Sequence, residues 1–276
     1  MNYESKRCKK PKNDIKCTMI TLYESILGST KSGKNKIIIE KIQAWIDSVS
    51  QDKNISHFGY NCKNKFTIND DLTISYSGNL YLDVCFINGR YEEITQIPEY
   101  INFNKIDGDF QIKLYTIDTM KKSQFPKEIG RILYIKGNRE VLKDIYIKAH
   151  DVVFSNNSFF SKIENVKVEL GEDGTINFND SKITIEEFKK IEFVNGNLES
   201  IECSNTPMGN ELLKTRNKFF KKEDMQCFKK YMMEIVPKSK YPNLIRITIK
   251  PKRKLLDYGL KDWWILTDEY GKWITK

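Results

Sequence analysis

One short phrase recurs between residues 95 and 205 and constrains the fold of this chain more than any other feature. It consists of an apolar residue, any residue and a second apolar residue, followed shortly by an asparagine. The copies are Leu133-Tyr134-Ile135 before Asn138, Val152-Val153-Phe154 before Asn157, Ile176-Asn177-Phe178 before Asn179, Ile191-Glu192-Phe193 before Asn197, and Ile201-Glu202-Cys203 before Asn205. Alternating apolar residues predict short strands, and an asparagine can satisfy open backbone groups at a turn. The phrase therefore predicts a β-solenoid of strand–turn units, with those five asparagines holding the turns.

A longer unit occurs twice ahead of these phrases. Pro98 leads into an apolar segment ending at Ile112, and Pro126 leads into one ending at Ile135. Equivalent asparagines in the later units lie about 18–22 residues apart, close to the leucine-rich period. We therefore expect residues 57–206 to form an irregular leucine-rich-repeat-like β-solenoid. Its predicted core consists of Leu133, Ile135, Val153, Phe154, Phe178, Phe193 and Ile201.

The segments on either side of the predicted solenoid have different patterns. Residues 1–18 are basic and polar, and we expect a flexible tail. Apolar residues at helical spacing predict a helical segment over 19–56, with its second helix at about 36–49. A hairpin from Phe66 to Asp83 is expected to cap the solenoid, since an open edge strand invites aggregation. Residues 207–276 are expected to form a basic α+β region. With helical and β segments in one chain, the expected fold class is α+β.

The positive charge points to two classes of partner. The net charge is +9, but 39 of the 46 basic residues are lysine, whereas arginine is the residue that best clamps phosphates. A lysine-covered surface that keeps the protein in solution is one interpretation. The other is a nucleic-acid-associated protein that binds through its basic flanks. The candidate interaction residues in these flanks are Lys9, Lys10, Lys221, Lys222, Lys252, Arg253 and Trp264.

Motifs for catalysis or cofactor binding are not convincing. The stretch from Gly28 to Asn35 resembles a phosphate-binding loop, but it follows a helical segment and has asparagine in place of the Ser/Thr that would bind magnesium. The six cysteines form no C-x-x-C pair, and there are only two histidines, so no metal site is expected. The pairs Glu92-Glu93 and Asp107-x-Asp109 are interpreted as solvated turns. We therefore predict no cofactor, no metal and no enzymatic activity.

The phrase from Pro98 to Ile112, with its partner from Phe125 to Gly130, resembles an irregular leucine-rich-repeat family common in tailed bacteriophages. The segment from Leu22 to Leu27 is similar to short N-terminal segments in proteins of crAss-like phages. The chain departs from the family in its fewer leucines, its uneven spacing and its long basic C-terminal region. The resemblance implies a phage-encoded, non-enzymatic interaction protein whose partner is a virion or host protein.

The location expected from the sequence follows from two further observations. No apolar run reaches the length of a transmembrane helix, and the N-terminus does not have the pattern of a signal peptide. We therefore expect a soluble protein in the virion or the host cytoplasm, with no membrane association. The sequence leaves open whether the partner is contacted in the particle or early in infection.

Overall fold

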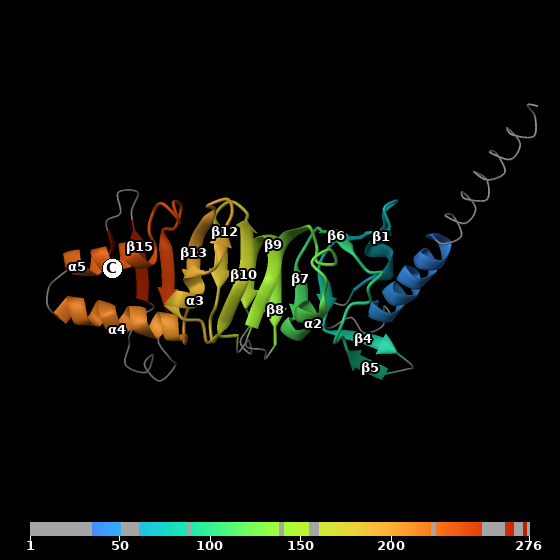
Figure 1. Ribbon diagram of the computed structural model, residues 1–276, viewed down its shortest axis with the longest axis horizontal. Coiled ribbons are helices and arrows are strands. Elements are labelled where there is room, and N and C mark those ends of the chain that lie inside the picture. Colours follow the sequence, from blue (N-terminus) through green and yellow to red (C-terminus); the bar gives the residue numbers. More distant parts are fainter. Residues whose placement is uncertain are drawn as a thin grey trace, which may run out of the picture.

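A computed structural model describes residues 35–50, 61–87, 90–137, 141–154, 160–221, 225–249, 263–267 and 273–274. One long sheet runs along the molecule, with helices at its two ends (Figure 1). Among the described residues the sheet has 14 strands. They are β1 (Phe66–Ile68), β2 (Ile74–Tyr76), β3 (Leu80–Leu82), β6 (Phe103–Ile106), β7 (Phe110–Lys113), β8 (Glu128–Lys136), β9 (Val141–Phe154), β10 (Lys162–Leu170), β11 (Gly174–Asn177), β12 (Glu192–Phe193), β13 (Leu198–Glu202), β14 (Arg246–Ile249), β15 (Trp263–Thr267) and β16 (Trp273–Ile274).

The interior of the sheet is parallel, and antiparallel pairs lie at its two ends. Parallel pairing extends from β2 to β14. β1 pairs antiparallel with β2, and β14, β15 and β16 form antiparallel pairs. A separate antiparallel ribbon consists of β4 (Val84–Ile87) and β5 (Arg90–Glu93). The helical elements are a helix at 35–49, the 3-10 turn η1 (Lys63–Lys65), α2 (Leu114–Thr119), α3 (Ile185–Lys189), α4 (Pro207–Lys221) and α5 (Met225–Ile235).

The leucine-rich-repeat-like solenoid predicted for residues 57–206 is wrong, and so is the α+β class. The described chain is a mixed α/β structure built on one largely parallel sheet with few helices. Leu133 pairs with Val152, 19 positions on, whereas Ile201 pairs with Ile247, 46 positions on. A solenoid of repeats needs units of similar length. The recurring phrase marks strands of a common sheet, but it does not mark equal repeats.

Strict alternation decides which side chains enter the core. Leu133, Ile135 and Phe154 are buried, as predicted. Val153 is half-buried on the opposite face, because its neighbours Val152 and Phe154 point inward and successive strand residues face opposite sides. Phe193, also predicted to be in the core, is half-buried. In four of the five phrases the core therefore uses the outer two residues, and in the fifth only the first outer residue, Ile191, is fully buried.

Aromatic side chains pack at the first end of the sheet and beside α3. At the first end, the predicted helix is present at 35–49, and its Trp45 ring lies 5.8 Å from that of Phe103 and 6.4 Å from that of Phe66. Beside α3 (Ile185–Lys189), Tyr241 stacks on Phe188 of that helix, with their ring centroids 5.5 Å apart. Packing of these rings removes apolar surface from water.

Polar side chains join neighbouring strands where the chain bends. The side-chain oxygens of Asn79, Asp109, Asp151 and Asn179 each accept a hydrogen bond from a backbone N–H of the next strand segment, at distances of 2.9, 3.3, 2.7 and 2.7 Å. Asn61 makes two bonds to Tyr81: its side-chain oxygen accepts from the backbone N–H, and its side-chain NH2 donates to the carbonyl. These contacts satisfy backbone groups that the bends remove from the ladder.

Candidate interaction surfaces

The register of the sheet aligns four polar side chains in a row on its outward face. Tyr81 of β3 pairs with Gln111 of β7, which pairs with Tyr134 of β8. Across Val153 of β9, the row continues to Asn177 of β11. All five are half-buried, and adjacent strands lie about 4.8 Å apart. We call Tyr81, Gln111, Tyr134 and Asn177 the Tyr–amide row.

Charged groups beside the first half of this row already have partners of opposite sign. Lys113 forms an ion pair with Glu93, and the Lys136 ammonium lies 3.4 Å from the Asp83 carboxylate. Gln111 also donates a hydrogen bond to Asp83. Burial, helped by the acidic neighbour Asp109, raises the pKa of Tyr134, so its hydroxyl stays protonated. This part of the face offers aromatic rings, a hydroxyl and an amide rather than excess charge.

At the Asn177 end of the row, a carboxylate accepts hydrogen bonds from two asparagine side chains. One oxygen of Glu202 on β13 accepts hydrogen bonds from Asn177 at 2.5 Å and from Asn179 at 3.0 Å. Because Asn179 also accepts from the backbone N–H of Ser204, its amide is held from both sides. The amide planes at this end are therefore fixed before any partner arrives, which lowers the entropic cost of binding.

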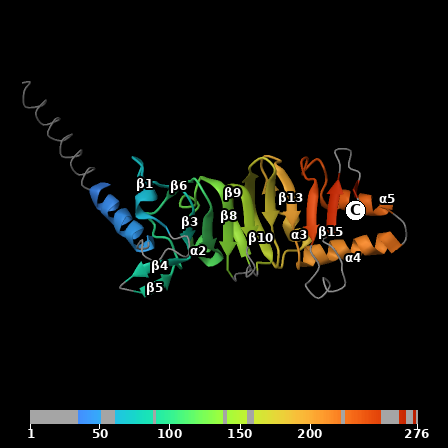
Figure 2. The ribbon, with the colours of Figure 1, turned by 180° about the vertical axis from the view of Figure 1, so that it is seen from behind.

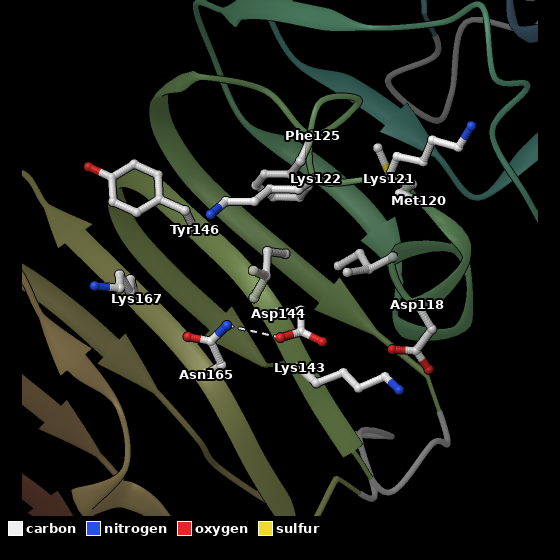
Figure 3. A pocket seen from close by; sticks show the side chains of 12 residues that line it. Asp118, Met120, Lys121, Lys122, Phe125, Lys143, Asp144, Tyr146, Asn165 and Lys167 are labelled. Carbon is white, nitrogen blue, oxygen red and sulfur yellow. Dashed lines mark hydrogen bonds between the residues drawn. The ribbon is translucent and has the colours of Figure 1, made fainter.

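A cleft of about 310 Å³ lies on another part of the molecule, between α2 and strands β9 and β10 (Figure 3). It is lined by Ile117, Asp118, Met120, Lys121, Lys122, Phe125, Lys143, Asp144, Ile145, Tyr146, Asn165 and Lys167. Lys121 pairs with Glu99 at 2.7 Å, and Lys167 pairs with Glu192 at 2.8 Å. Lys122 and Lys143 point toward different ends of the cleft in Figure 3. The lysines therefore do not converge on one point.

Two residues at the mouth of the cleft have left-handed backbones. Asp144 has φ 52° and Asn165 has φ 51°, and the Asn165 amide donates to the Asp144 carboxylate at 2.9 Å (Figure 3). Asp180 and Asn205 repeat this arrangement, with φ 61° and 57° and a 2.9 Å hydrogen bond. Asn and Asp tolerate this conformation best. The repetition indicates a structural turn rather than strain reserved for the cleft.

Several acidic groups on the described surface are engaged in local contacts. Asp107 lies 3.6 Å from Lys105, and Asp109 accepts from a backbone N–H. The Tyr146 hydroxyl donates to Glu169, which raises the pKa of Tyr146 to about 12 and lowers the pKa of Glu169. Within the described ranges, no three His, Cys, Asp or Glu side chains gather where they could hold a metal ion.

One carboxyl pair gives a test by pH. Burial, followed by a hydrogen bond and repulsion from Asp173, raises the pKa of Glu199. A carboxyl whose pKa rises on folding favours the folded state at low pH and opposes it once ionised. Replacing Glu199 with glutamine should therefore raise the melting temperature at about pH 8, where the carboxyl group is ionised. It should not do so at about pH 3.5, where the carboxyl group is protonated. The gain should stay below about 1 kcal/mol, because Glu199 is only half-buried and Asp173 is exposed to screening solvent. An equal shift at both pH values would contradict this.

The structure places the residues singled out from the sequence in different regions. Asn197 donates to the Leu170 carbonyl at 3.2 Å, and Asn205 bonds Asp180. Lys221 ends α4, and Trp264 lies in β15 opposite Thr248. The others lie outside the described residues: Asn138, Asn157, Lys9, Lys10, Lys222, Lys252 and Arg253.

Sequence reasoning missed the Tyr–amide row. The signal was the middle residue of each phrase, which faces outward when its two neighbours face the core. Tyr134 and Asn177 occupy that middle position, between Leu133 and Ile135 and between Ile176 and Phe178. The pairing of strands that brings these middle residues together could not be read from spacing, because the spacing varies.

Comparisons with known proteins give little support for any family. No family model matches the chain, and no solved structure matches it. A stretch of 101 residues, 34% of the chain, is 31% identical to part of the ATP phosphoribosyltransferase regulatory subunit of Clostridium acetobutylicum. The match covers 24% of that protein, so the chain spans about a quarter of its length. This partial likeness does not assign the chain to a family.

Within the ranges that the structure describes, no helix combines the length and the apolar content needed to cross a bilayer.

Proposed function

We propose that this protein is a non-enzymatic interaction protein that binds a protein partner through the Tyr–amide row. The observation that carries the proposal is the strand register that brings Tyr81, Gln111, Tyr134 and Asn177 together across the parallel sheet. Tyrosine is enriched in protein interfaces, because its ring provides a large contact area with few rotatable bonds, and amides adapt to either donors or acceptors.

Two features support this proposal over a catalytic role. The charges next to the row are matched within the chain, and the cleft beside α2 has lysines that point apart. General acid–base catalysis needs groups converging on one reacting atom. From the sequence resemblance to phage proteins alone, whose repeat fold this chain does not have, we propose a virion protein or a host protein as the partner. The partial relative is, by its name, a regulatory subunit, which fits a role exerted on another protein.

The test uses the tagged full-length chain as bait in infected cells, with its captured partner identified and then purified. Replacement of Tyr134 with alanine should weaken binding of that partner roughly 30-fold, equivalent to about 2 kcal/mol for an interface hot spot. Tyr81→Ala should act in the same direction. Tyr146→Ala is the matched control, because Tyr146 is also a half-buried strand tyrosine but belongs to the cleft. Equal affinity of Tyr134→Ala and the unmodified protein would sink the proposal.

A basic nucleic-acid-associated protein is the second candidate, and the cleft lining favours it. Four lysines and two aspartates line the cleft, and of these lysines Lys121 and Lys167 are already paired with Glu99 and Glu192. Binding to phosphates releases counterions, so affinity for a DNA duplex should fall steeply as salt rises. Fluorescence anisotropy with a labelled duplex at increasing salt measures this. Binding that is weakened by Lys122→Ala and Lys143→Ala, but not by Tyr134→Ala, would favour this function over the first.

A further inference from the structure

The β4–β5 ribbon lies apart from the large sheet. β4 and β5 pair antiparallel with each other, with Val84 opposite Glu93 and Phe86 opposite Tyr91. Among the described residues, neither strand pairs with any other. Figures 1 and 2 show the ribbon beside the first half of the sheet, projecting from the body in both views. A two-stranded ribbon is marginally stable by itself and has two open edges.

The hydrogen-bond pattern shows which backbone groups lie on those edges. The Ile94 N–H donates to the Asp83 carbonyl at 3.1 Å, just before the ribbon begins. In an antiparallel pair, hydrogen-bonded and non-hydrogen-bonded positions alternate along each strand. Cys85 and Glu92 are therefore hydrogen-bonded partners, whereas Val84 and Phe86 direct their N–H and C=O groups away from β5. On the other strand, Tyr91 directs its backbone groups outward in the same way.

The two edges differ in how well they are protected. β5 has the sequence Arg-Tyr-Glu-Glu, and its Arg90, Glu92 and Glu93 side chains are exposed. Charged side chains on an edge strand oppose the approach of another strand. β4 has the sequence Val-Cys-Phe-Ile, with no charge and no proline. Among the described residues, no other strand pairs with the outward backbone groups of β4, whereas the charged side chains of β5 oppose strand addition on that edge.

We propose that β4 is a docking edge, onto which an extended, mainly uncharged segment of a partner protein adds as the third strand of the ribbon. Only another extended backbone matches alternating N–H and C=O groups at this spacing, and such strand addition is a common mode of peptide recognition. An uncharged segment suits an apolar strand, because charge would be desolvated beside it. The ribbon is tied to the Tyr–amide row by the ion pair from Glu93 of β5 to Lys113, two positions beyond Gln111. The inference extends the proposed function but does not depend on it.

The experiment selects a displayed library of random short peptides on the full-length chain and measures the binders by fluorescence anisotropy. Phe86→Pro removes one outward N–H from β4. It leaves the bonds between β4 and β5 in place, because the Phe86 N–H does not point toward β5. Proline is tolerated at such an edge position. We expect peptides that bind the unmodified chain and lose at least about tenfold in affinity on Phe86→Pro. Phe86→Ala keeps the N–H and should lose clearly less than Phe86→Pro.

Tyr91→Pro is the matched control, because it removes an outward N–H from β5, the charged edge of the same ribbon. It should leave peptide affinity within about twofold, and circular dichroism should show that both proline variants remain folded. Failure to select any peptide, or equal binding of all peptides to Phe86→Pro and Tyr91→Pro, would overturn the proposal. Dimerisation of the unmodified chain that Phe86→Pro abolishes would also overturn it, by making a second copy the occupant. Loss of the captured partner in Tyr134→Ala but not in Phe86→Pro would leave the proposed function standing without strand addition.

Discussion

Truncation of Phe178 to alanine is expected to lower the free energy of unfolding by roughly 3–5 kcal/mol, as for other buried aromatic side chains. Phe178 is fully buried and lies where three other rings meet. Its ring is nearly parallel to that of Phe154, with centroids 5.2 Å apart, and Phe160 and Phe188 are each 6.1 Å away. Removal of the ring leaves a cavity whose walls are themselves large rings with little room to move.

Urea unfolding of the full chain measures this loss, and Phe193→Ala provides the control. Phe193 is a phenylalanine in the same part of the sheet, but it is half-buried and its ring lies 6.0 Å from that of Phe188. Its truncation should cost clearly less than that of Phe178. A loss below about 1 kcal/mol for Phe178→Ala would place the ring outside the core, because buried large-to-small changes exceed that value.

The local elements of this fold could be predicted because their signals are local. Ile42, Trp45, Ile46 and Val49 repeat at helical spacing, and the structure buries them on one side of the helix at 35–49. The alternation around Leu133 and Ile135 likewise predicts a strand with both side chains inward. Such patterns depend only on the geometry of one segment against a core.

The Val153 prediction failed for a physical reason that the sequence already contained. Val153 and Phe154 are adjacent in one strand, so they cannot both face the core. If Phe154 faces the core, the other inward residue must be Val152, which lies two residues earlier in the strand. The structure buries both side chains. Hydrophobicity favoured Val153 for the core, but the two-residue period of the strand puts it on the outward face.

The global arrangement could not be predicted from spacing. The predicted strands lie at uneven intervals in the sequence, and these intervals do not show which strands pair with each other. β9 pairs with β10 along Val141–Ala149 and with β8 and β11 near Val152, so one strand serves three neighbours. The Tyr–amide row depends on these pairings, and so does the separation of the β4–β5 ribbon from the sheet. The middle residue of a phrase indicates an outward side chain, but which outward side chains become neighbours has no local signal.

Replacement of Gly130 with alanine should destabilise the protein by roughly 2–3 kcal/mol, as expected when overpacking forces the backbone to shift. A Cβ at this position would lie 2.2 Å from the Asp107 carbonyl oxygen and 2.9 Å from its carbonyl carbon. The obstacle is the backbone of the neighbouring segment rather than the end of a flexible side chain. The pairing register of β8 with β9 also shifts between Ile129 and Ile132, so Gly130 lies where the ladder is irregular.

The cost of Gly130→Ala should appear as a lower melting temperature and a lower denaturant midpoint for the whole chain, since β8 joins the β6–β7 side of the sheet to β9. Arg131→Ala is the matched control on the next residue. The Arg131 side chain is 65% exposed, and its guanidinium makes a long contact of 3.8 Å with Asp109. Its removal should therefore change stability by no more than about 0.5 kcal/mol. Equal stability of Gly130→Ala and Arg131→Ala would show that β8 can move away from Asp107. The close approach of the two backbones would then be no constraint on the sheet, and the position would not require glycine.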